Sequence, residues 1–267
     1  MPTVRYALGI EYDGSAFNGW QSQPDGRTVQ DALEAALSTV AASDVRVHCA
    51  GRTDAGVHAL CQVAHFDTDA ARPDSAWVRG VNSNLPDTVA VRWAQAVNED
   101  FHARFSATGR RYRYVLLNRP QRPALWTKHA GWHHLPLDAE AMREAAQHFL
   151  GEHDFSAFRA AECQAKSPVK TLYRADVQRQ GDWIVFDFHA NAFLHHMVRN
   201  LVGTLVYVGK GAHGAAWARE VLESRSRAVA APTFSAAGLY FAGVDYDPVF
   251  GLTEKIAACG AFPLPPL

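Results

Sequence analysis

The sequence predicts an α+β fold made of two ferredoxin-like halves, with their sheets side by side and a basic cleft between them. Apolar patterns follow the order β-α-β-β-α-β in each half, which is the split arrangement of a ferredoxin-like unit. A segment rich in basic residues begins near residues 100–106, where we place the boundary between the halves. We therefore expect an N-terminal half over residues 1–105, a C-terminal half over 106–246, and a Pro- and Gly-rich tail over 247–267.

Alternating apolar runs and one strong helical stripe predict the elements of the first half. They are strand 3–12, helix 28–41, strands 45–50 and 60–67, a short helix near 74–83, and strand 88–97. Thr28 can cap the long helix, with Asp31 at the position of a capping-box acid. Apolar residues from Val29 to Val40 recur at helical spacing, so one face of this helix should be buried.

The second half repeats this order loosely. Its predicted elements are strand 107–117, a helix from Asp138 to Gly151, strands 170–179 and 183–190, a largely buried helix 194–208, a helix 215–225, and strand 238–245. Met142, Ala145 and Phe149 form the apolar stripe of the first of these helices, and Gly151 is a typical helix stop.

The composition is that of an ordinary globular protein, with 48% hydrophobic and 20% charged residues in 267. No apolar run is long enough to cross a bilayer, and the N-terminus lacks a signal-peptide pattern, so we expect no membrane partner. The four cysteines are scattered without a CxxC pair, which favours free thiols over a disulfide framework. These features predict a cytoplasmic protein.

Basic residues are concentrated in one segment. Residues 101–137 contain seven Lys or Arg and no Asp or Glu, so this segment carries +7 within a chain of net charge −1. Its arginines alternate with aromatic residues such as Phe105 and Tyr112, which combines phosphate-binding and base-stacking groups. A solvated basic face is the alternative, but such faces normally include acids. We therefore expect a polyanion site here, with RNA as its ligand.

Residues 51–58, GRTDAGVH, place one carboxylate in a glycine-bounded turn between two apolar runs. Asp54 lies two residues after Arg52 and is the one acid between Asp44 and Asp67, so it does not belong to a charged surface. A nearby arginine favours the ionised carboxylate, which suits a nucleophile or an electrostatic stabiliser. The alternative is an aspartate that caps a turn.

Strand alternation places Tyr112 and Tyr114 on one face and the adjacent arginines on the other. One tyrosine at the cleft could stack on a base, whereas for Tyr114 we prefer a role in the core. Arg199 lies one turn after His195 and His196 in an apolar run, where a cation needs a partner. Asp54 is a candidate partner, and an arginine that extends to water from the helix end is the alternative.

Two further motifs have weaker support. His58, Cys61 and His65 could hold a metal if they lay on a helix, but the segment alternates like a strand and no second cluster completes four ligands. We therefore expect no metal site. Residues 209–214 match G-x-G-x-x-G, yet no acid follows about 20 residues later on a second strand. A helix C-cap followed by a loop explains these glycines better than a dinucleotide site.

Three long motifs stand out: GRTDAGVHA (51–59), FHARFSATGRRYRY (101–114) and NAFLHHMVRNLVG (191–203). In this order and spacing, they resemble the TruA family of tRNA pseudouridine synthases. Shorter segments agree, among them Thr28-Val-Gln and Gly238-Leu-Tyr, and the similarity extends from about residue 3 to 245. Such a match favours a functional role for Asp54 over turn capping.

The resemblance implies an isomerase that converts uridine to pseudouridine at positions 38, 39 and 40 of the tRNA anticodon stem-loop. It implies a homodimer that needs no cofactor and no metal. It assigns Asp54 as nucleophile, Arg52 and Arg199 as its basic neighbours, and Tyr112 as the residue that packs on the flipped-out base. It also implies tRNA contacts by two segments: Phe101, His102, Ala103, Arg104 and Phe105, and Glu162, Cys163, Gln164, Ala165 and Lys166.

These residues are compatible with attack of the carboxylate at C1′ of the sugar and with attack at C6 of the base. The C5 proton could be taken by Asp54 or by Tyr112 with a water molecule. Two other functions remain open. A non-catalytic tRNA-binding module would use the basic segment without Asp54, and a nucleotide-dependent oxidoreductase would use the glycines at 209–214.

Overall fold

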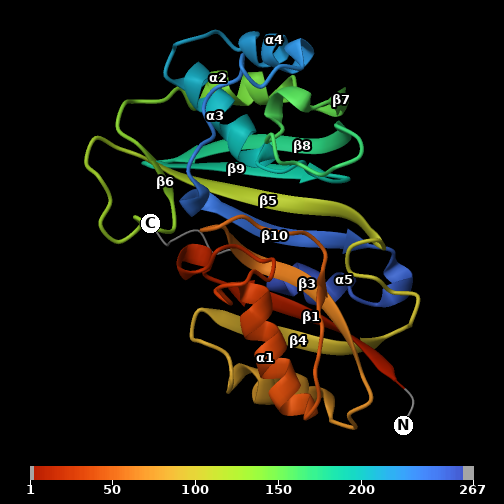
Figure 1. The fold of residues 1–267 in the computed structure, drawn as a ribbon. Coiled ribbons are helices and arrows are strands. Elements are labelled where there is room, and N and C mark those ends of the chain that lie inside the picture. Colours follow the sequence, from red (N-terminus) through yellow and green to blue (C-terminus); the bar gives the residue numbers. More distant parts are fainter. Residues whose placement is uncertain (1–2, 261–267) are drawn as a thin grey trace. The chain divides into compact units, whose positions relative to one another are not determined.

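The computed structural model describes residues 3–260, which form two compact units (Figure 1). Unit 1 contains residues 3–108 and 240–260, and unit 2 contains residues 109–239. Within residues 3–260, no helix combines the length and the apolar character that spanning a membrane requires. Residues 261–267 of the predicted tail lie outside the described residues.

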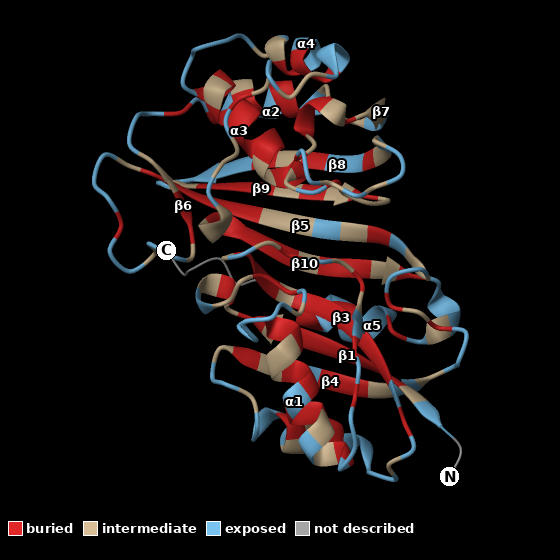
Figure 2. Ribbon diagram, in the orientation of Figure 1, coloured by how far each residue is buried: buried red, intermediate tan, exposed pale blue. Residues whose placement is uncertain are grey.

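Unit 1 is built on a sheet with strand order β4-β1-β3-β10. The strands are β1 (Val4–Tyr12), β3 (His58–Thr68), β4 (Val89–Val97) and β10 (Leu239–Tyr246), and the short β2 (His48–Cys49) pairs with β3. β1 runs antiparallel to β3 and β4, whereas β10 is parallel to β3. Buried residues follow these strands (Figure 2), because both faces of the sheet are covered.

Helices cover the two faces of the unit 1 sheet (Figure 1). On one face, α1 (Val29–Ala41) lies beside a π-helical turn at Ala76–Gly80, whose Trp77 ring is 5.5 Å from Tyr6 and 5.1 Å from Phe66. On the other face, α5 (Thr253–Cys259) packs against β1 and β3. This covering explains why β1 and β3 are apolar on both sides.

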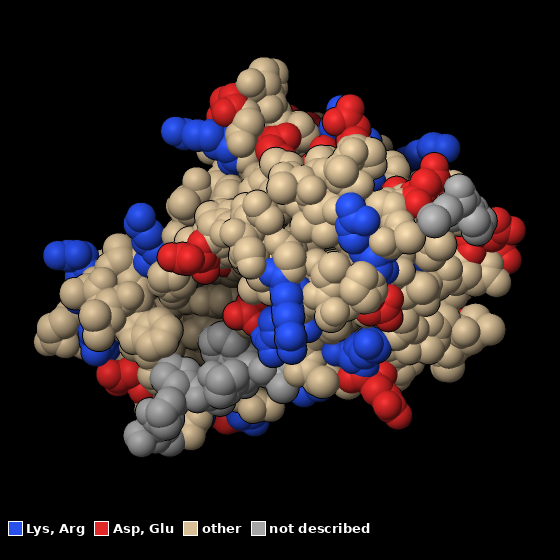
Figure 3. Space-filling view, turned by 90° about the horizontal axis from the view of Figure 1, so that it is seen from below, with Lys and Arg blue, Asp and Glu red and all other residues tan. Residues whose placement is uncertain are grey.

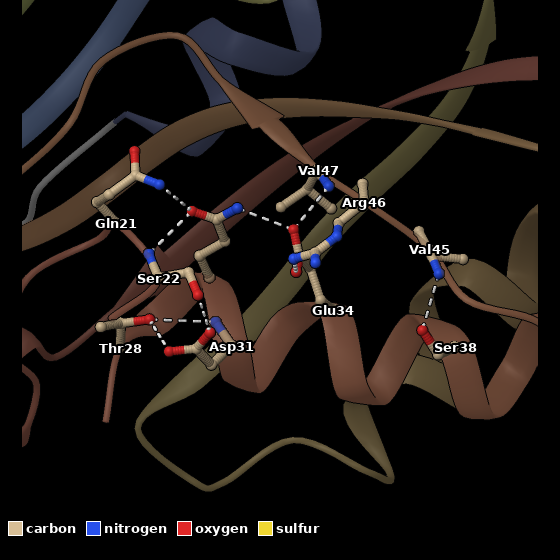
Figure 4. A network of polar contacts seen from close by, with 10 residues as sticks. Gln21, Ser22, Thr28, Asp31, Glu34, Ser38, Val45, Arg46 and Val47 are labelled. Carbon is tan, nitrogen blue, oxygen red and sulfur yellow. Dashed lines mark hydrogen bonds and ion pairs between the residues drawn. The ribbon is translucent and has the colours of Figure 1, made fainter. Parts of the chain in front are cut away.

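Polar contacts tie α1 to the chain around it (Figure 4). The Thr28 hydroxyl accepts the Asp31 N–H at 3.2 Å, which confirms the predicted N-cap. The Asp31 carboxylate in turn accepts from the Ser22 hydroxyl at 2.5 Å. Glu34 is buried and accepts the Val47 N–H at 3.0 Å. Because the Val47 amide bonds to this helix, the predicted strand 45–50 is reduced to β2.

Unit 2 is built on a sheet with strand order β5-β9-β8-β7. The strands are β5 (Ala107–Asn118), β7 (Gly151–Asp154), β8 (Val169–Gln180) and β9 (Trp183–Ala190), and β6 (Gly131–His133) pairs parallel to β5. The pairings β5–β9, β9–β8 and β8–β7 are antiparallel. Helices α2 (Ala139–Gln147), α3 (Met197–Gly209) and α4 (Trp217–Ser224) lie together (Figure 1), and α2 packs on β8.

The predicted α+β class is confirmed, with differences in detail. The strand predicted to close the second half is β10, and it pairs with β3 of unit 1. Helix α3 begins at Met197 rather than at residue 194, because His196 has φ +62° and interrupts the helix there. Helix α2 ends at Gln147, and Gly151 begins β7 instead of ending the helix.

The segment predicted as a tail contains secondary structure in its described part. A 3₁₀ turn spans Pro248–Phe250 and is followed by α5. The Cys259 thiol donates to the Leu60 carbonyl at 3.3 Å, which links α5 to β3. Residues 247–260 are therefore part of the packing of unit 1.

Candidate active site

Asp54 lies in the loop between β2 and β3 of unit 1, and its backbone is fixed by hydrogen bonds on both sides. The Thr53 carbonyl accepts the Trp20 N–H at 3.0 Å, and the Asp54 carbonyl accepts the Val57 N–H at 3.1 Å. The Thr53 hydroxyl is 2.7 Å from the Tyr12 hydroxyl, and both side chains are buried. The Asp54 residue itself is half-buried. The loop therefore holds a carboxylate at a defined place that solvent can reach.

Glycines permit the close packing of this loop. Gly56 has φ +76°, as the turn predicted for residues 51–56 requires. Gly19 has φ +89°, and a Cβ there would lie 2.6 Å from the Thr53 carbonyl oxygen, so no larger residue fits without displacing the loop. The Gly51 carbonyl accepts the side-chain amide of the buried Gln62 at 2.7 Å. Buried side chains of unit 1 thus hold the backbone of this loop in place.

The two arginines assigned as basic neighbours lie in different units. Arg52 is an exposed residue of the Asp54 loop in unit 1. Arg199 is in the first turn of α3 in unit 2 and is half-buried. Its Nε donates to the Phe234 carbonyl at 2.8 Å, and its own carbonyl accepts the Phe234 N–H at 3.2 Å. The guanidinium is therefore held by the Phe234 carbonyl within unit 2, and an interaction with Asp54 stays a prediction.

Tyr112 lies on β5 and is half-buried. Its ring meets Phe193 edge to face, with centroids 5.0 Å apart and an interplanar angle of 80°. Tyr114 is fully buried and its hydroxyl donates to the Ser235 carbonyl at 2.9 Å, so its predicted core role is confirmed. A partly exposed ring held by a second aromatic residue is suited to pack on a nucleobase.

The segment Phe101–Phe105 presents its residues in two ways. Phe101 and Ala103 are fully buried, and the Phe101 ring packs edge to face on Tyr246 at 5.0 Å. Arg104 is exposed, and Phe105 is 76% exposed. Direct contact with a polyanion is therefore open to the side chains of His102, Arg104 and Phe105, whereas Phe101 and Ala103 support the segment from inside.

The loop Glu162–Lys166 of unit 2 is held by an arginine and carries a cysteine with altered acidity. The Arg159 guanidinium donates to the Ala165 carbonyl at 3.1 Å and also to the Cys163 carbonyl. Cys163 Sγ accepts the His195 N–H at 3.4 Å. Partial burial opposes ionisation of the Cys163 thiol, but the backbone N–H groups of Ala165 and His195 and the Arg159 charge lower its pKa. The exposed residues of the loop are Glu162, Gln164 and Lys166.

The basic residues of segment 101–137 differ in their surroundings. Arg113 forms a bidentate ion pair with Asp187 on β9, at 2.7 and 2.9 Å. Arg110 donates to the Asn191 carbonyl at 3.0 Å. The residues with exposed positions are Arg104, Arg111, Arg122 and Lys128. On the face drawn in Figure 3, Lys and Arg side chains are interspersed with Asp and Glu. Phosphate contacts would therefore come from individual exposed cations.

The structure bears on both alternative motifs. Residues 58–68 form β3, as the alternating pattern predicted, with an irregularity in the pairing with β1 between Ala59 and Gln62, so His58, Cys61 and His65 do not lie on the helix that their spacing as ligands would need. Gly209 is the last residue of α3, and residues 210–214 follow it, with Gly211 at φ +75°. The glycine motif is thus the end of a helix and a loop, as preferred, and does not connect a strand to a helix.

Sequence reasoning missed the buried side chains that position these segments. Tyr12 supports the Asp54 loop through Thr53. His65 and Tyr246 contact the segment that contains Ala103, through an N–H and a carbonyl respectively. Each lies on a strand whose alternation predicts burial, but nothing in the local pattern identifies a partner 38 or more residues away.

Comparisons with known proteins agree on one family. A family described as "tRNA pseudouridine synthase" matches residues 9–106 and 145–247. Asp54 and Arg199 lie inside the matched segments, and Tyr112 lies between them. Three proteins named tRNA pseudouridine synthase A are similar over nearly their whole length. That of Dechloromonas aromatica (strain RCB) is 66% identical, over 94% of this chain and 96% of the relative. Those of Aromatoleum aromaticum and Methylobacillus flagellatus are 65% and 59% identical, over 93% and 94% of this chain and 94% and 97% of the relatives.

Proposed function

This chain belongs to the tRNA pseudouridine synthase family, and we propose that it isomerises uridines 38, 39 and 40 of the tRNA anticodon arm with Asp54 as nucleophile. Membership makes it an isomerase that forms pseudouridine in tRNA. The observation that carries the assignment to Asp54 is its loop, in which hydrogen bonds fix the backbone on both sides of a half-buried carboxylate.

The reaction needs a group that stabilises an electron-poor centre without being consumed. The C1′–N1 bond breaks, the uracil turns, and C1′ joins C5; C5 loses a proton and N1 gains one. An ionised carboxylate can trap C1′ while the uracil leaves with the bonding electrons, and addition to C6 is the other route. Asp54, or Tyr112 with a water molecule, would accept the C5 proton. Nothing is oxidised or reduced, so we propose that no cofactor and no metal take part.

Tyr112 is proposed to pack on the target base once that base has left its stack. Extrusion of a base costs a few kcal/mol, and stacking on one aromatic side chain returns roughly 1–3 kcal/mol. One tyrosine therefore barely balances extrusion, and phosphate contacts must supply most of the affinity. The exposed Arg104, Arg111, Arg122 and Lys128 are suited to supply them. We propose that Phe105 and the loop Glu162–Lys166 also contact tRNA.

The resemblance to the TruA family also supports one statement about the oligomeric state and one about the cellular compartment. We propose that the enzyme acts as a homodimer and that it works in the cytoplasm. Sedimentation of the full chain with and without tRNA would test the first of these, since a monomer at working concentration would contradict it.

The proposed activity is tested by incubating the protein with unmodified tRNA and no added cofactor, and then mapping pseudouridine. Transcripts in which uridines 38, 39 and 40 are replaced by cytidine, one at a time, identify the sites. We expect each replacement to abolish modification at its own position. Binding without any pseudouridine would favour the non-catalytic module, and a requirement for a nicotinamide cofactor would favour the oxidoreductase.

A further inference from the structure

The peptide groups on either side of Ala103 are held by two side chains from the unit 1 sheet. The Ala103 N–H donates to Nδ1 of His65 at 3.1 Å, and the Ala103 carbonyl accepts the Tyr246 hydroxyl at 2.7 Å. His65 lies on β3 and is 2% exposed, and Tyr246 ends β10 and is 9% exposed. Two buried groups from different strands thus fix one residue of a surface segment.

The residues just before Ala103 are anchored as well. Arg5 on β1 donates to the Phe101 carbonyl at 2.9 Å and to the Glu99 carbonyl at 2.5 Å, and it forms an ion pair with Asp67 at 2.7 Å. The Phe101 ring is also 5.2 Å from Phe250. The chain therefore reaches Ala103 along a fixed path.

The residues just after Ala103 are the exposed ones. Nδ1 of His102 accepts the N–H groups of Arg104 and Phe105, at 3.1 and 3.3 Å, which closes a tight turn. The His102 ring lies 4.3 Å from the Phe105 ring, and the Arg104 guanidinium carbon is 5.6 Å from the Phe105 centroid. An aromatic ring and a cation are thus presented together at the surface.

We infer that His65 and Tyr246 are positioning residues for tRNA binding. By holding Ala103, they fix the orientation in which the side chains of Arg104 and Phe105 project from the surface. This inference rests on the proposed function, which assigns the segment to tRNA. A segment that is ordered before binding avoids the entropy of ordering it in the complex. Loss of either contact should therefore weaken tRNA binding while the chemistry at Asp54 continues.

His65 can accept this hydrogen bond only while its Nδ1 carries no proton, which requires the neutral ring with its proton on Nε2. Its surroundings favour that form. Burial lowers the pKa of His65 to about 4, and the cations or rings of His102, Arg5 and His48 act in the same direction, against the smaller opposing effect of Asp67. The ring of His48 is 5.2 Å away and that of His102 is 4.6 Å away.

Two substitutions at residue 65 separate the acceptor from the ring. His65→Leu removes the acceptor. We expect the Kd for tRNA to rise about 5- to 100-fold, the factor that corresponds to the free-energy cost of an unsatisfied buried N–H. The turnover rate at saturating tRNA should not change. His65→Asn should restore binding, because its side-chain oxygen takes the place of Nδ1. His153→Asn, at a half-buried histidine of unit 2, is the matched control and should bind like wild type.

Tyr246→Phe tests the same inference with a smaller change, which matters if His65→Leu does not fold. It removes the hydroxyl alone and should also raise Kd while leaving the saturated rate unchanged. Long-range ¹H–¹⁵N spectra of the imidazoles should show His65 protonated at Nε2. A proton on Nδ1 at neutral pH would overturn the inference.

Arg104→Ala and Phe105→Ala distinguish failure of this inference from failure of the proposed function. If these changes weaken tRNA binding but folded His65→Leu and Tyr246→Phe bind normally, the positioning role is wrong and the assignment of the segment stands. If neither pair has an effect, the assignment of the segment to tRNA is wrong. If wild type forms no pseudouridine, the proposed activity itself is wrong.

Discussion

Tyr12→Phe should slow pseudouridine formation without weakening tRNA binding. The Tyr12 and Thr53 hydroxyls are 2.7 Å apart, with 3% and 7% of the residues exposed. Burial raises the pKa of Tyr12, so the phenol stays protonated and can donate. Phenylalanine keeps the ring beside Trp20, whose centroid is 6.0 Å away. The substitution therefore removes one hydrogen bond directly before Asp54.

The size of the effect follows from the burial of both partners. A buried hydroxyl that loses its partner costs ~1–3 kcal/mol. If this cost appears as displacement of the Asp54 loop, the rate at saturating tRNA should fall about 5- to 100-fold. Thr53→Val removes the other partner. The double variant loses the same hydrogen bond, but it contains neither hydroxyl, so no buried hydroxyl of this pair is left unsatisfied. The sum of the two single losses in the free energy of unfolding should thus exceed the loss in the double variant by ~1 kcal/mol or more.

Urea unfolding and single-turnover rates at saturating tRNA would measure both quantities for wild type, the two single variants and the double variant. Tyr173→Phe, at a tyrosine of β8 that is 52% exposed, is the control and should change neither. Additive single effects on stability would refute the hydrogen bond. A normal rate in a destabilised Tyr12→Phe would refute its role in placing Asp54.

Three further outcomes are expected. An unfolded histidine titrates near ~6.5, whereas burial lowers the pKa of His65 to about 4, so between these values the unfolded chain binds more protons. The free energy of unfolding should fall as pH is lowered through this window, by ~3 kcal/mol in all, and urea titrations of His65→Asn should lack that part of the slope. A plot of log Kd for tRNA against log salt should have a slope of magnitude roughly 3 if four phosphates are contacted, and filter binding that is flat with salt would exclude the basic residues as phosphate ligands. Tyr112→Phe should retain stacking and much of its activity, and complete loss in a pseudouridine assay would show that the hydroxyl takes part in the chemistry.

Local sequence patterns predicted most of the fold because the elements have strong local signals. Helix α1 begins at the Thr28 cap with the expected buried stripe, and β3 alternates as expected. The partner of β10 could not be predicted, because its parallel pairing joins Tyr240 to His58, across 182 residues, and no local pattern encodes such a contact. The apolar run from Leu194 continued the helical pattern of α3. The left-handed backbone conformation of His196, after which the helix begins at Met197, could therefore not be predicted.

The candidate site was predicted unevenly for a similar reason. Isolation of Asp54 between glycines singled it out, and the resemblance to a family assigned its role. Which residues of the basic segment are accessible could not be predicted, because Phe101 is buried by Tyr246 and Phe250, which are distant in the sequence. Likewise Arg113 is neutralised by Asp187 on the neighbouring strand. These outcomes depend on strand pairing, which the sequence does not specify locally.

The central claim is that the carboxylate of Asp54 performs the isomerisation. The most direct test is the single-turnover rate of Asp54→Asn, an isosteric change, on tRNA at saturating concentration, beside a measurement of tRNA binding. We predict normal binding and a rate below about a thousandth of wild type, a loss of ~4 kcal/mol or more in transition-state stabilisation. Turnover above that level in the bound complex would contradict the assignment of Asp54 as nucleophile.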